Sequence, residues 1–487
     1  MKSYKSIFIF LLLVFPVSCD DFLDVKPADR IDASTFFAND QELLLGVNGV
    51  YLAQRQVYGG GSEYNILEGR SDNTGFDHTD QAERTATDIF TEVPGNLLLD
   101  LTWAGMYRII NLANLVITRA PDASGDATLI NRIVGEAKFI RAFTYFHMVN
   151  IWGGVPMRTT PTEDFGNTII PRATVDEVSN QIVQDLTDAS TMLPTSYDGA
   201  AGNEVGRVTS YAALTLLGKV ELQRGNASAA VAALRQVENQ YSLLPNFGDI
   251  HAAGNVNTAE SIFEVSFDPG NQTGFGRGNA YIPAVVAQRL GIVAGGDTRA
   301  ILFPFATQDL IDAFDDPNDL RIPFTFGIEP GVEPGGYITK FIDLAAASAG
   351  ADVNVVLLRY ADVLLMLAEA LGEGAEAYTL INQVRTRAGL PDIDAATPGT
   401  FMEKLMKETT PELAFEMHRW FDLRRLPDAE AIAILNAQLT AQQAFFTQFP
   451  NYAGPTTFNL TADRLLYPIP ETEISISEGV VVQNPGH

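Results

Sequence analysis

Apolar positions recur at helical spacing along much of the chain. Within residues 129–145, Ile133, Ala137 and Ile140 follow one another at intervals of four and three residues, so they share one face of a helix. Paired glycines and a proline in residues 152–156 (WGGVP) then end that helix. The pattern predicts an amphipathic core helix at this place in the chain.

Two other segments have the pattern of helical hairpins. Residues 208–241 form a unit of 34 residues in which two alanine- and leucine-rich runs flank Gly225 and Asn226, as in a tetratricopeptide repeat. Residues 357–391 contain a second pair, whose first helix is expected to include Leu357. Because repeat helices bury their apolar faces only against neighbouring helices, we expect several pairs to pack together in a mainly α fold.

Two stretches lack helical periodicity. Residues 59–97 are rich in Gly, Asp, Thr and Asn, and residues 245–351 are rich in Gly, Pro, Phe and Asn. We expect long loops there, with a few short strands such as residues 261–267. Ordered loops of this length in a compact domain usually carry function, so we expect the ligand face to lie there.

The composition excludes several classes of function. Among 487 residues, 60 acidic and 32 basic side chains give a net charge of −28, which repels phosphate backbones and makes nucleic acid an unsuitable partner. Cys19 is the only cysteine, so neither an intramolecular disulfide nor a zinc site built on cysteines can form. A hydrophobic fraction of 46% supplies a large core and excludes global disorder.

The N-terminus has the features of an export signal. Lys2 and Lys5 precede an apolar run over residues 7–17, which is shorter than the ~20 residues that span a bilayer. The run closes on Cys19 and resembles a bacterial lipoprotein signal. That resemblance implies that residues 1–18 are removed and that Cys19 is acylated.

Sequence motifs of the common enzymes are absent. The chain has no HExxH, GxSxG or P-loop motif, and no GxGxxG after a strand. Its five histidines are far apart in sequence, and none has metal-ligand spacing with another. The acidic run at residues 312–319 suits either a calcium site or ordinary turns, and turns are the simpler interpretation. We therefore expect a protein that is not an enzyme and has neither a cofactor nor a metal.

Aromatic residues in the irregular stretches are the candidate ligand contacts. Trp103, Trp152 and Trp420 lie in helices or at a helix end beside apolar residues, so we assign them to the core. A ring that stacks on a sugar or on a peptide side chain must then come from the loops. The candidates are Phe76, Phe90, Phe267, Phe275 and Tyr281. The alternative is that each ring packs beneath its own loop.

Several short sequence blocks follow one another along the chain. They include CDDFLDVKP, EAKFIRAFTYF, WGGVP and LRYADVLLMLAEA. Their order and content resemble the SusD/RagB family, the surface lipoproteins of Bacteroidota that serve TonB-dependent outer-membrane transporters. Any single block is weak evidence, but the ordered set is specific. The blocks are residues 19–27, 103–114, 136–146, 152–156, 358–370, 381–391, 412–425, 467–470 and 483–486.

The resemblance implies one helical domain over residues 19–487, with an N-terminal part (19–244) and a C-terminal part (245–487). About four tetratricopeptide-like helix pairs would form its scaffold, and irregular loops on one side would carry the ligand site. No tryptophan lies in either loop region, unlike starch-binding members, which stack glucose on tryptophan. The residues implied at the site are Asp72, Asn73, Phe76, Phe267, Phe275 and Tyr281.

Charged residues alternate with aromatic ones near Trp420. This alternation indicates partly buried charge pairs that close the helical packing, which is a structural role. The residues concerned are Glu416, Arg419, Asp422 and Arg424.

The resemblance also implies a function. A family member is anchored to the outer face of the outer membrane, caps a SusC-type TonB-dependent transporter, and captures oligosaccharides, or in some members peptides, before transport. Two alternatives remain. An acidic protein favours cationic peptides through its field, and a tetratricopeptide scaffold could serve only to assemble other surface proteins. A surface hydrolase is disfavoured by the missing motifs.

Overall fold

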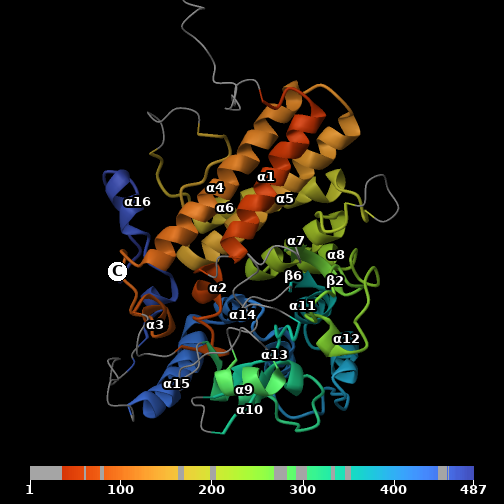
Figure 1. The fold of residues 1–487 in the computed structure, drawn as a ribbon, viewed down its shortest axis with the longest axis vertical. Coiled ribbons are helices and arrows are strands. Elements are labelled where there is room, and N and C mark those ends of the chain that lie inside the picture. The colour runs from red at the N-terminus through yellow and green to blue at the C-terminus, as the bar shows by residue number, and fades with distance from the viewer. Residues whose placement is uncertain are drawn as a thin grey trace, which may run out of the picture.

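Four pairs of helices form the scaffold of the computed structural model (Figure 1). The pairs are α1 (Asp40–Gly59) with α4 (Leu97–Arg119), α5 (Ala127–Trp152) with α6 (Val175–Met192), α7 (Ser210–Gln223) with α8 (Ala227–Leu234), and α11 (Tyr360–Leu371) with α12 (Ala375–Arg387). Contacts of α4 with α5, α6 with α7 and α8 with α11 join the pairs in series. The mainly α, tetratricopeptide-like fold is thereby confirmed.

The structure describes most of the chain from residue 36 onward. Cys19 and the export signal, Phe275 and Tyr281 lie outside the described residues. The described ranges are 36–59, 62–76, 82–162, 169–197, 204–267, 282–291, 304–330, 335–345, 353–447, 458 and 460–487.

Local sequence sets where the helices begin and end. Asp126 caps α5, and its carboxylate accepts a hydrogen bond from the Thr128 amide nitrogen at 2.8 Å. Gly153 ends the same helix with φ 72°, a backbone conformation that costs glycine no steric strain. Gly225, with φ 75°, makes the tight turn between α7 and α8. The amphipathic helix and the first hairpin are therefore confirmed.

Two expectations about helices were wrong in detail. Leu357 lies in strand β6 (Val355–Arg359), and α11 begins only at Tyr360. The β-branched and apolar run before Tyr360 pairs with β2 (Ser261–Val265), so sheet hydrogen bonds take the place of helical ones. The first irregular stretch also contains regular elements, namely α2 (Ser62–Leu67), β1 (Thr74–Gly75) and α3 (Ala82–Asp88).

The mid-chain and C-terminal segments add short elements on one side of the scaffold. Antiparallel pairing joins β1 to β3 (Phe305–Ala306), β2 to β6, and β4 (Phe326–Gly327) to β5 (Tyr337–Ile338). Figure 1 places α9, α10, α13 and α15 together, away from α1, α4, α5 and α6. The remaining helices are α9 (Ala284–Leu290), α10 (Gln308–Ala313), α13 (Phe401–Leu413), α14 (Arg419–Arg425), α15 (Asp428–Phe446) and α16 (Glu471–Ile476), with 3-10 turns at Ala120–Asp122, Phe247–Asp249, Ile322–Phe324 and Ala462–Leu465.

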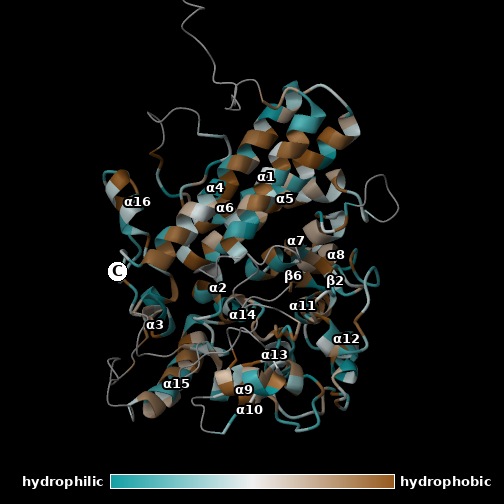
Figure 2. Cartoon of the chain, viewed as in Figure 1, coloured by the Kyte–Doolittle hydropathy of each residue, from teal (hydrophilic) through white to brown (hydrophobic). Residues whose placement is uncertain are grey.

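One continuous apolar core includes residues from both halves of the chain. Trp152 and Trp420 are fully buried and Trp103 is 5% exposed, so their assignment to the core is confirmed. Phe90 is also buried, with its ring 6.3 Å from that of Trp420. Figure 2 shows apolar and polar residues mixed along the scaffold helices. Of the helices in the described ranges, none has the length and apolar character needed to cross a membrane.

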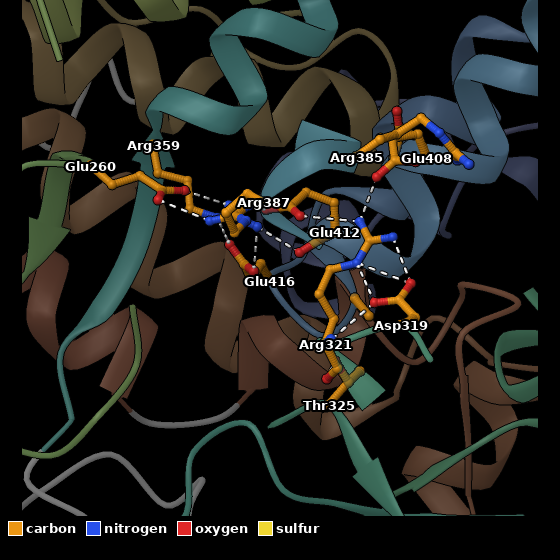
Figure 3. A network of polar contacts seen from close by, with 12 residues as sticks. Glu260, Asp319, Arg321, Thr325, Arg359, Arg385, Arg387, Glu408, Glu412 and Glu416 are labelled. Atoms are coloured by element: carbon orange, nitrogen blue, oxygen red, sulfur yellow. Dashed lines mark hydrogen bonds and ion pairs between the residues drawn. The ribbon is translucent and has the colours of Figure 1, made fainter. Parts of the chain in front are cut away.

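A buried network of ion pairs holds the irregular side on the scaffold. Figure 3 shows Arg321, Arg359 and Arg387, from three different segments, converging on Glu412 of α13. The Glu412 carboxylate lies 3.2 Å from Arg321 Nη1 and 2.5 Å from Arg359 Nη1. Because Glu412 is fully buried, its charge depends on these partners for compensation.

The network is balanced in charge. Arg359 also pairs with Glu416 at 2.7 Å and with Glu260 at 2.8 Å. Its partners are the residue directly before β2, a residue of α13 and a residue of the turn after α13, so these segments are held together electrostatically. The five acidic members are Glu260, Asp319, Glu408, Glu412 and Glu416, and the five basic members are Arg321, Lys340, Arg359, Arg385 and Arg387.

The charged residues near Trp420 have the structural role that was expected. Glu416, Arg419 and Asp422 are all buried and ion-paired, whereas the pair formed by Arg424 is longer and more exposed. The four pairs are Glu416–Arg359, Arg419–Asp72, Asp422–Arg425 and Arg424–Asp428.

Candidate functional site

Asp72 and Asn73 lie where the N-terminal part of the chain meets the mid-chain segment. Thr307, which caps α10, binds both: its hydroxyl donates to the Asp72 carbonyl oxygen at 2.5 Å, and its amide nitrogen donates to the Asn73 carbonyl oxygen at 3.1 Å. Directly after them, Gly75 of β1 pairs with Phe305 of β3. These contacts join two segments that are 235 residues apart in the chain.

The Asp72 side chain is held by an arginine of α14. Its two carboxylate oxygens accept hydrogen bonds from Nε and Nη2 of Arg419, each at 2.6 Å. Both side chains are less than a tenth exposed. A bidentate pair of this kind fixes both groups in one geometry, so Asp72 and Arg419 form a rigid wall.

A depression of about 180 Å³ opens beside this wall, between α10, α13 and α14. Asn73 is 1% exposed, and its side-chain oxygen Oδ1 is buried without a hydrogen-bond partner in the described part of the chain. Asp309 of α10 adds a carboxylate, whose pKa is raised by partial burial and by the nearby charges of Asp72 and Asp312. The depression therefore presents these acceptors beside the donors of Lys407 and Thr410, and both kinds of group suit the hydroxyl groups of a sugar.

A second depression, of about 190 Å³, shares Asp309 with the first. Two phenyl rings line it: Phe305 is buried, and Phe445 of α15 is half-buried. Two amides also line it, and they are joined to each other because Gln438 Nε2 donates to Gln442 Oε1 at 2.8 Å. The side chains of β3, α10 and α15 thus form one continuous surface with the first depression.

Gly75 makes the close approach at this surface possible. A Cβ atom at this position would lie 2.3 Å from the Phe305 ring and 2.6 Å from Nε2 of Gln442. The same Nε2 donates to the Asp88 carboxylate at 2.9 Å, so Gln442 has little room to move. Glycine is therefore required for β1 to lie against the floor of the second depression.

Rings, amides and carboxylates are the groups by which proteins recognise sugars. A ring packs on the apolar face of a sugar, while amide and carboxylate groups hydrogen-bond its hydroxyls. The lining of the two depressions thus offers contacts for binding.

The structure brings only part of the predicted site together. Asp72 and Asn73 line the first depression. Phe76 is fully buried and packs against Gly69, so its ring faces the protein interior. Phe267 is half-buried and contacts the end of α1 at Gly59, beside a different groove. Phe275 and Tyr281 lie outside the described residues and stay predictions.

Sequence reasoning missed the residues that α15 contributes. Gln438, Ala441, Gln442 and Phe445 all line the second depression. Their spacing of three, four and seven residues from Gln438 puts them on one helix face. An amide-rich helix face that ends in an aromatic residue was therefore the available signal.

The acidic run at residues 312–319 begins in the last turn of α10 and then forms turns and ion pairs. Asp316 Oδ1 accepts a hydrogen bond from the Asn318 amide nitrogen at 2.9 Å, as in an ordinary Asx turn. The Asp319 carboxylate is bound by Arg321 at 2.8 Å. These contacts agree with the turn interpretation of the run.

Comparison with known proteins identifies the family. A model described as "SusD family" matches residues 327–487, and a model described as "Starch-binding associating with outer membrane" matches residues 21–222. A SusD-like protein of Formosa agariphila is 27% identical over an alignment that covers all of both chains. This chain belongs to the SusD family.

Solved structures share the fold. A laminarin binding SusD-like protein is 26% identical and superposes with a TM-score of 0.76, covering 93% of this chain and 100% of the other. Surface glycan-binding protein A from Bacteroides thetaiotaomicron, solved in complex with laminarihexaose, has a TM-score of 0.73 and covers 92% of this chain and 99% of its own. At 20% identity the second likeness concerns the fold alone.

Proposed function

We propose that this protein captures an oligosaccharide at the cell surface and delivers it to a SusC-type TonB-dependent transporter of the outer membrane. The observation that carries the proposal is the pair of adjoining depressions, where Phe305 and Phe445 lie beside amides and the Asp309 carboxylate. Membership of the SusD family supports it, as does the family description "Starch-binding associating with outer membrane". The protein acts by binding, without turnover.

Laminarihexaose is the first ligand to test. A relative that shares 26% identity and the fold is named for laminarin binding, and a second solved neighbour is in complex with laminarihexaose. The loop segments without tryptophan argue against starch, so maltohexaose serves as the comparison sugar. Because Asp309 and the net charge of −28 would also attract cations, a cationic peptide forms the third arm.

The binding experiment is titration calorimetry of the purified protein with these three ligands. The Phe445→Ala variant is expected to weaken laminarihexaose binding about two- to tenfold, the value of one aromatic contact. Phe324→Ala is the matched control, because Phe324 is a 39% exposed ring that lines neither depression. Equal losses in both variants, or binding of the peptide alone, would contradict glycan capture at this surface.

The mid-chain aromatics belong to the same proposal. Phe275 and Tyr281 precede α9 and β3 in the chain, and we place them among the ligand contacts on the grounds of the family resemblance. Tyr281→Ala is expected to lower laminarihexaose affinity and to leave the melting temperature unchanged. A matching drop in melting temperature would instead assign the ring to the core.

Lipid attachment at Cys19 is the proposed means of anchoring. Several acyl chains, at about 0.8 kcal/mol per buried methylene, hold a protein on a membrane without a spanning helix. In wild-type cells fed with labelled palmitate, the protein should carry the label, and protease added outside intact cells should remove it. The Cys19→Ala variant should carry no label and should be absent from the membrane fraction. Co-purification of a β-barrel transporter with the wild-type protein tests the partner.

A further inference from the structure

A groove of about 500 Å³ runs along α1, apart from the two depressions. Its lining comes from α1, from residues 204–207 before α7, and from residues 264–266 at the end of β2, and it shares no residue with either depression. The volume falls within the roughly 300–1,000 Å³ that is typical of small-molecule sites. Leu52 and Val205, which are 44% and 50% exposed, form an apolar rim.

The charged groups in the groove wall are already bound by their neighbours. Arg207 donates to Glu136 at 2.8 Å and to Asn48 at 2.7 Å. The Glu204 carboxylate accepts from Arg132, a hydrogen bond that lowers its pKa. Glu264, on the opposite wall, accepts from the amide nitrogen of Asn257 at 3.0 Å and from the side chain of Asn354 at 2.7 Å.

Two donors in the groove have no such partner. Gln54 is 1% exposed, and its Nε2 is buried without a hydrogen-bond acceptor in the described part of the chain. Arg55, the next residue, is half-buried and pairs with no carboxylate among the described residues. By contrast, the other arginine of the groove, Arg207, is paired with Glu136. A buried donor without a partner destabilises the folded protein, so an acceptor that enters the groove recovers that free energy on binding.

We propose that this groove is a second ligand site, which binds the carboxylate of an acidic saccharide. The Arg55 guanidinium matches a carboxylate in charge and in fork geometry, and the Gln54 amide supplies a further donor. The half-buried ring of Tyr51 and the rim of Leu52 offer apolar surface to the sugar ring. Salt screens the protein's charges beyond about 8 Å. The two carboxylates that line the groove itself, Glu204 and Glu264, are bound by Arg132 and by Asn257 and Asn354.

The two sites differ in the groups that are left to bind a ligand. The depressions at α10 hold donors such as Lys407 beside the acceptors of Asn73 and Asp309, whereas in the α1 groove both carboxylates are already bound and the donors of Gln54 and Arg55 are not. A neutral glycan therefore suits the depressions, and an acidic one suits the groove. The second site does not depend on the proposed function of the first, and separate ligands test the two.

The test is titration calorimetry of the purified protein with trigalacturonate and with galactotriose, its counterpart without carboxylates. The wild-type protein is expected to bind trigalacturonate at least about tenfold more tightly than galactotriose, and Arg55→Gln should remove that preference. Arg108→Gln is the matched control, because Arg108 is an exposed arginine on α4 that bonds Gln56 at 3.0 Å and lies outside the groove. It should retain the preference.

Gln54→Met provides a second readout. This substitution removes an unsatisfied donor at similar volume, so the melting temperature should stay equal or rise while trigalacturonate affinity falls. Laminarihexaose binding should be unchanged in the Arg55 and Gln54 variants. Equal binding of the two trisaccharides, a preference that survives Arg55→Gln, or an equal loss in Arg108→Gln would each overturn the second site, whatever the laminarihexaose result.

Discussion

Replacing Glu412 by Gln tests whether the buried ion-pair network holds the irregular side of the molecule on the scaffold. The wild-type carboxylate accepts from Arg359 at 2.5 Å, from Arg321 at 3.2 Å and from Arg387. The glutamine amide that replaces it keeps one acceptor oxygen, but its NH₂ group is a donor and cannot accept hydrogen bonds from the guanidinium groups. It therefore removes one of five negative charges and leaves a positive charge uncompensated in a fully buried place.

The expected loss follows from the cost of breaking a buried pair. Removing one partner of such a pair typically costs about 3–5 kcal/mol of unfolding free energy. With an unfolding entropy of about 2.1 cal/mol/K per residue, a chain of 487 residues loses roughly 1 °C in melting temperature per kcal/mol. We therefore expect Glu412→Gln to melt about 3–5 °C below the wild-type protein.

Glu376→Gln is the matched control for this prediction. Glu376 makes the same kind of pair with Arg235 at 2.5 Å, but the two side chains are 57% and 33% exposed. An exposed pair contributes about 0–1 kcal/mol, so the control should melt within about 1 °C of the wild type. Circular dichroism against temperature and against urea measures both. Equal melting temperatures for the two variants would refute the reasoning.

The stability that the Glu412 carboxylate contributes should depend on pH, and the direction of that dependence follows from its pKa. Burial alone would raise the pKa of Glu412, but the charges of Arg387 and Arg359 outweigh it and hold that pKa well below its usual range. A group with a depressed native pKa stabilises fully above its unfolded pKa, which is about 4.3 for glutamate, and loses that contribution as the pH falls toward the native pKa. The difference between wild type and Glu412→Gln should thus stay constant from about pH 7 to pH 5 and shrink below about pH 4.

Three further predictions concern the core and the candidate site. Trp420→Ala should lose about 3–5 kcal/mol of unfolding free energy, measured by urea denaturation, because the indole is fully buried and donates to a main-chain oxygen. Gly75→Ala should weaken laminarihexaose binding by pushing the Phe305 ring into the second depression, whereas Gly49→Ala, in α1 with no atom within 4 Å, should gain about 0.5–1 kcal/mol of stability. Partial burial raises the pKa of Asp309, so laminarihexaose binding that uses its carboxylate as an acceptor should begin to weaken at a higher pH than an ordinary aspartate would give as the pH is lowered, and Asp309→Asn should flatten that profile; an unchanged profile would exclude Asp309 from the contact.

The scaffold was predictable because its signals are local. Helical periodicity around Ile133, the glycine turn at Gly225 and the stop at Gly153 each act within a few residues, and all three appear in the structure. The boundary at Leu357 was missed because an apolar run of that length suits a strand as well as a helix, and pairing with β2 decides between them.

The candidate site was only partly predictable because it depends on contacts between distant segments. Asp72 and Asn73 were identified from their place in an irregular stretch, but Thr307 and α15 complete the surface from 235 or more residues away. Aromatic character alone did not distinguish Phe76, which is fully buried, from Phe445, which is half-buried at the surface.

By itself, the sequence determined the class of fold, the family, the acidic charge and the core role of the three tryptophans, since all of these depend on composition, order and local spacing. The tertiary structure decided which charges meet and which rings line a depression. Arg359 and Glu412 are 53 residues apart, and nothing local to either indicates the other. Burial and pairing arise only when the chain has packed, because they depend on what surrounds a side chain and not on what precedes it.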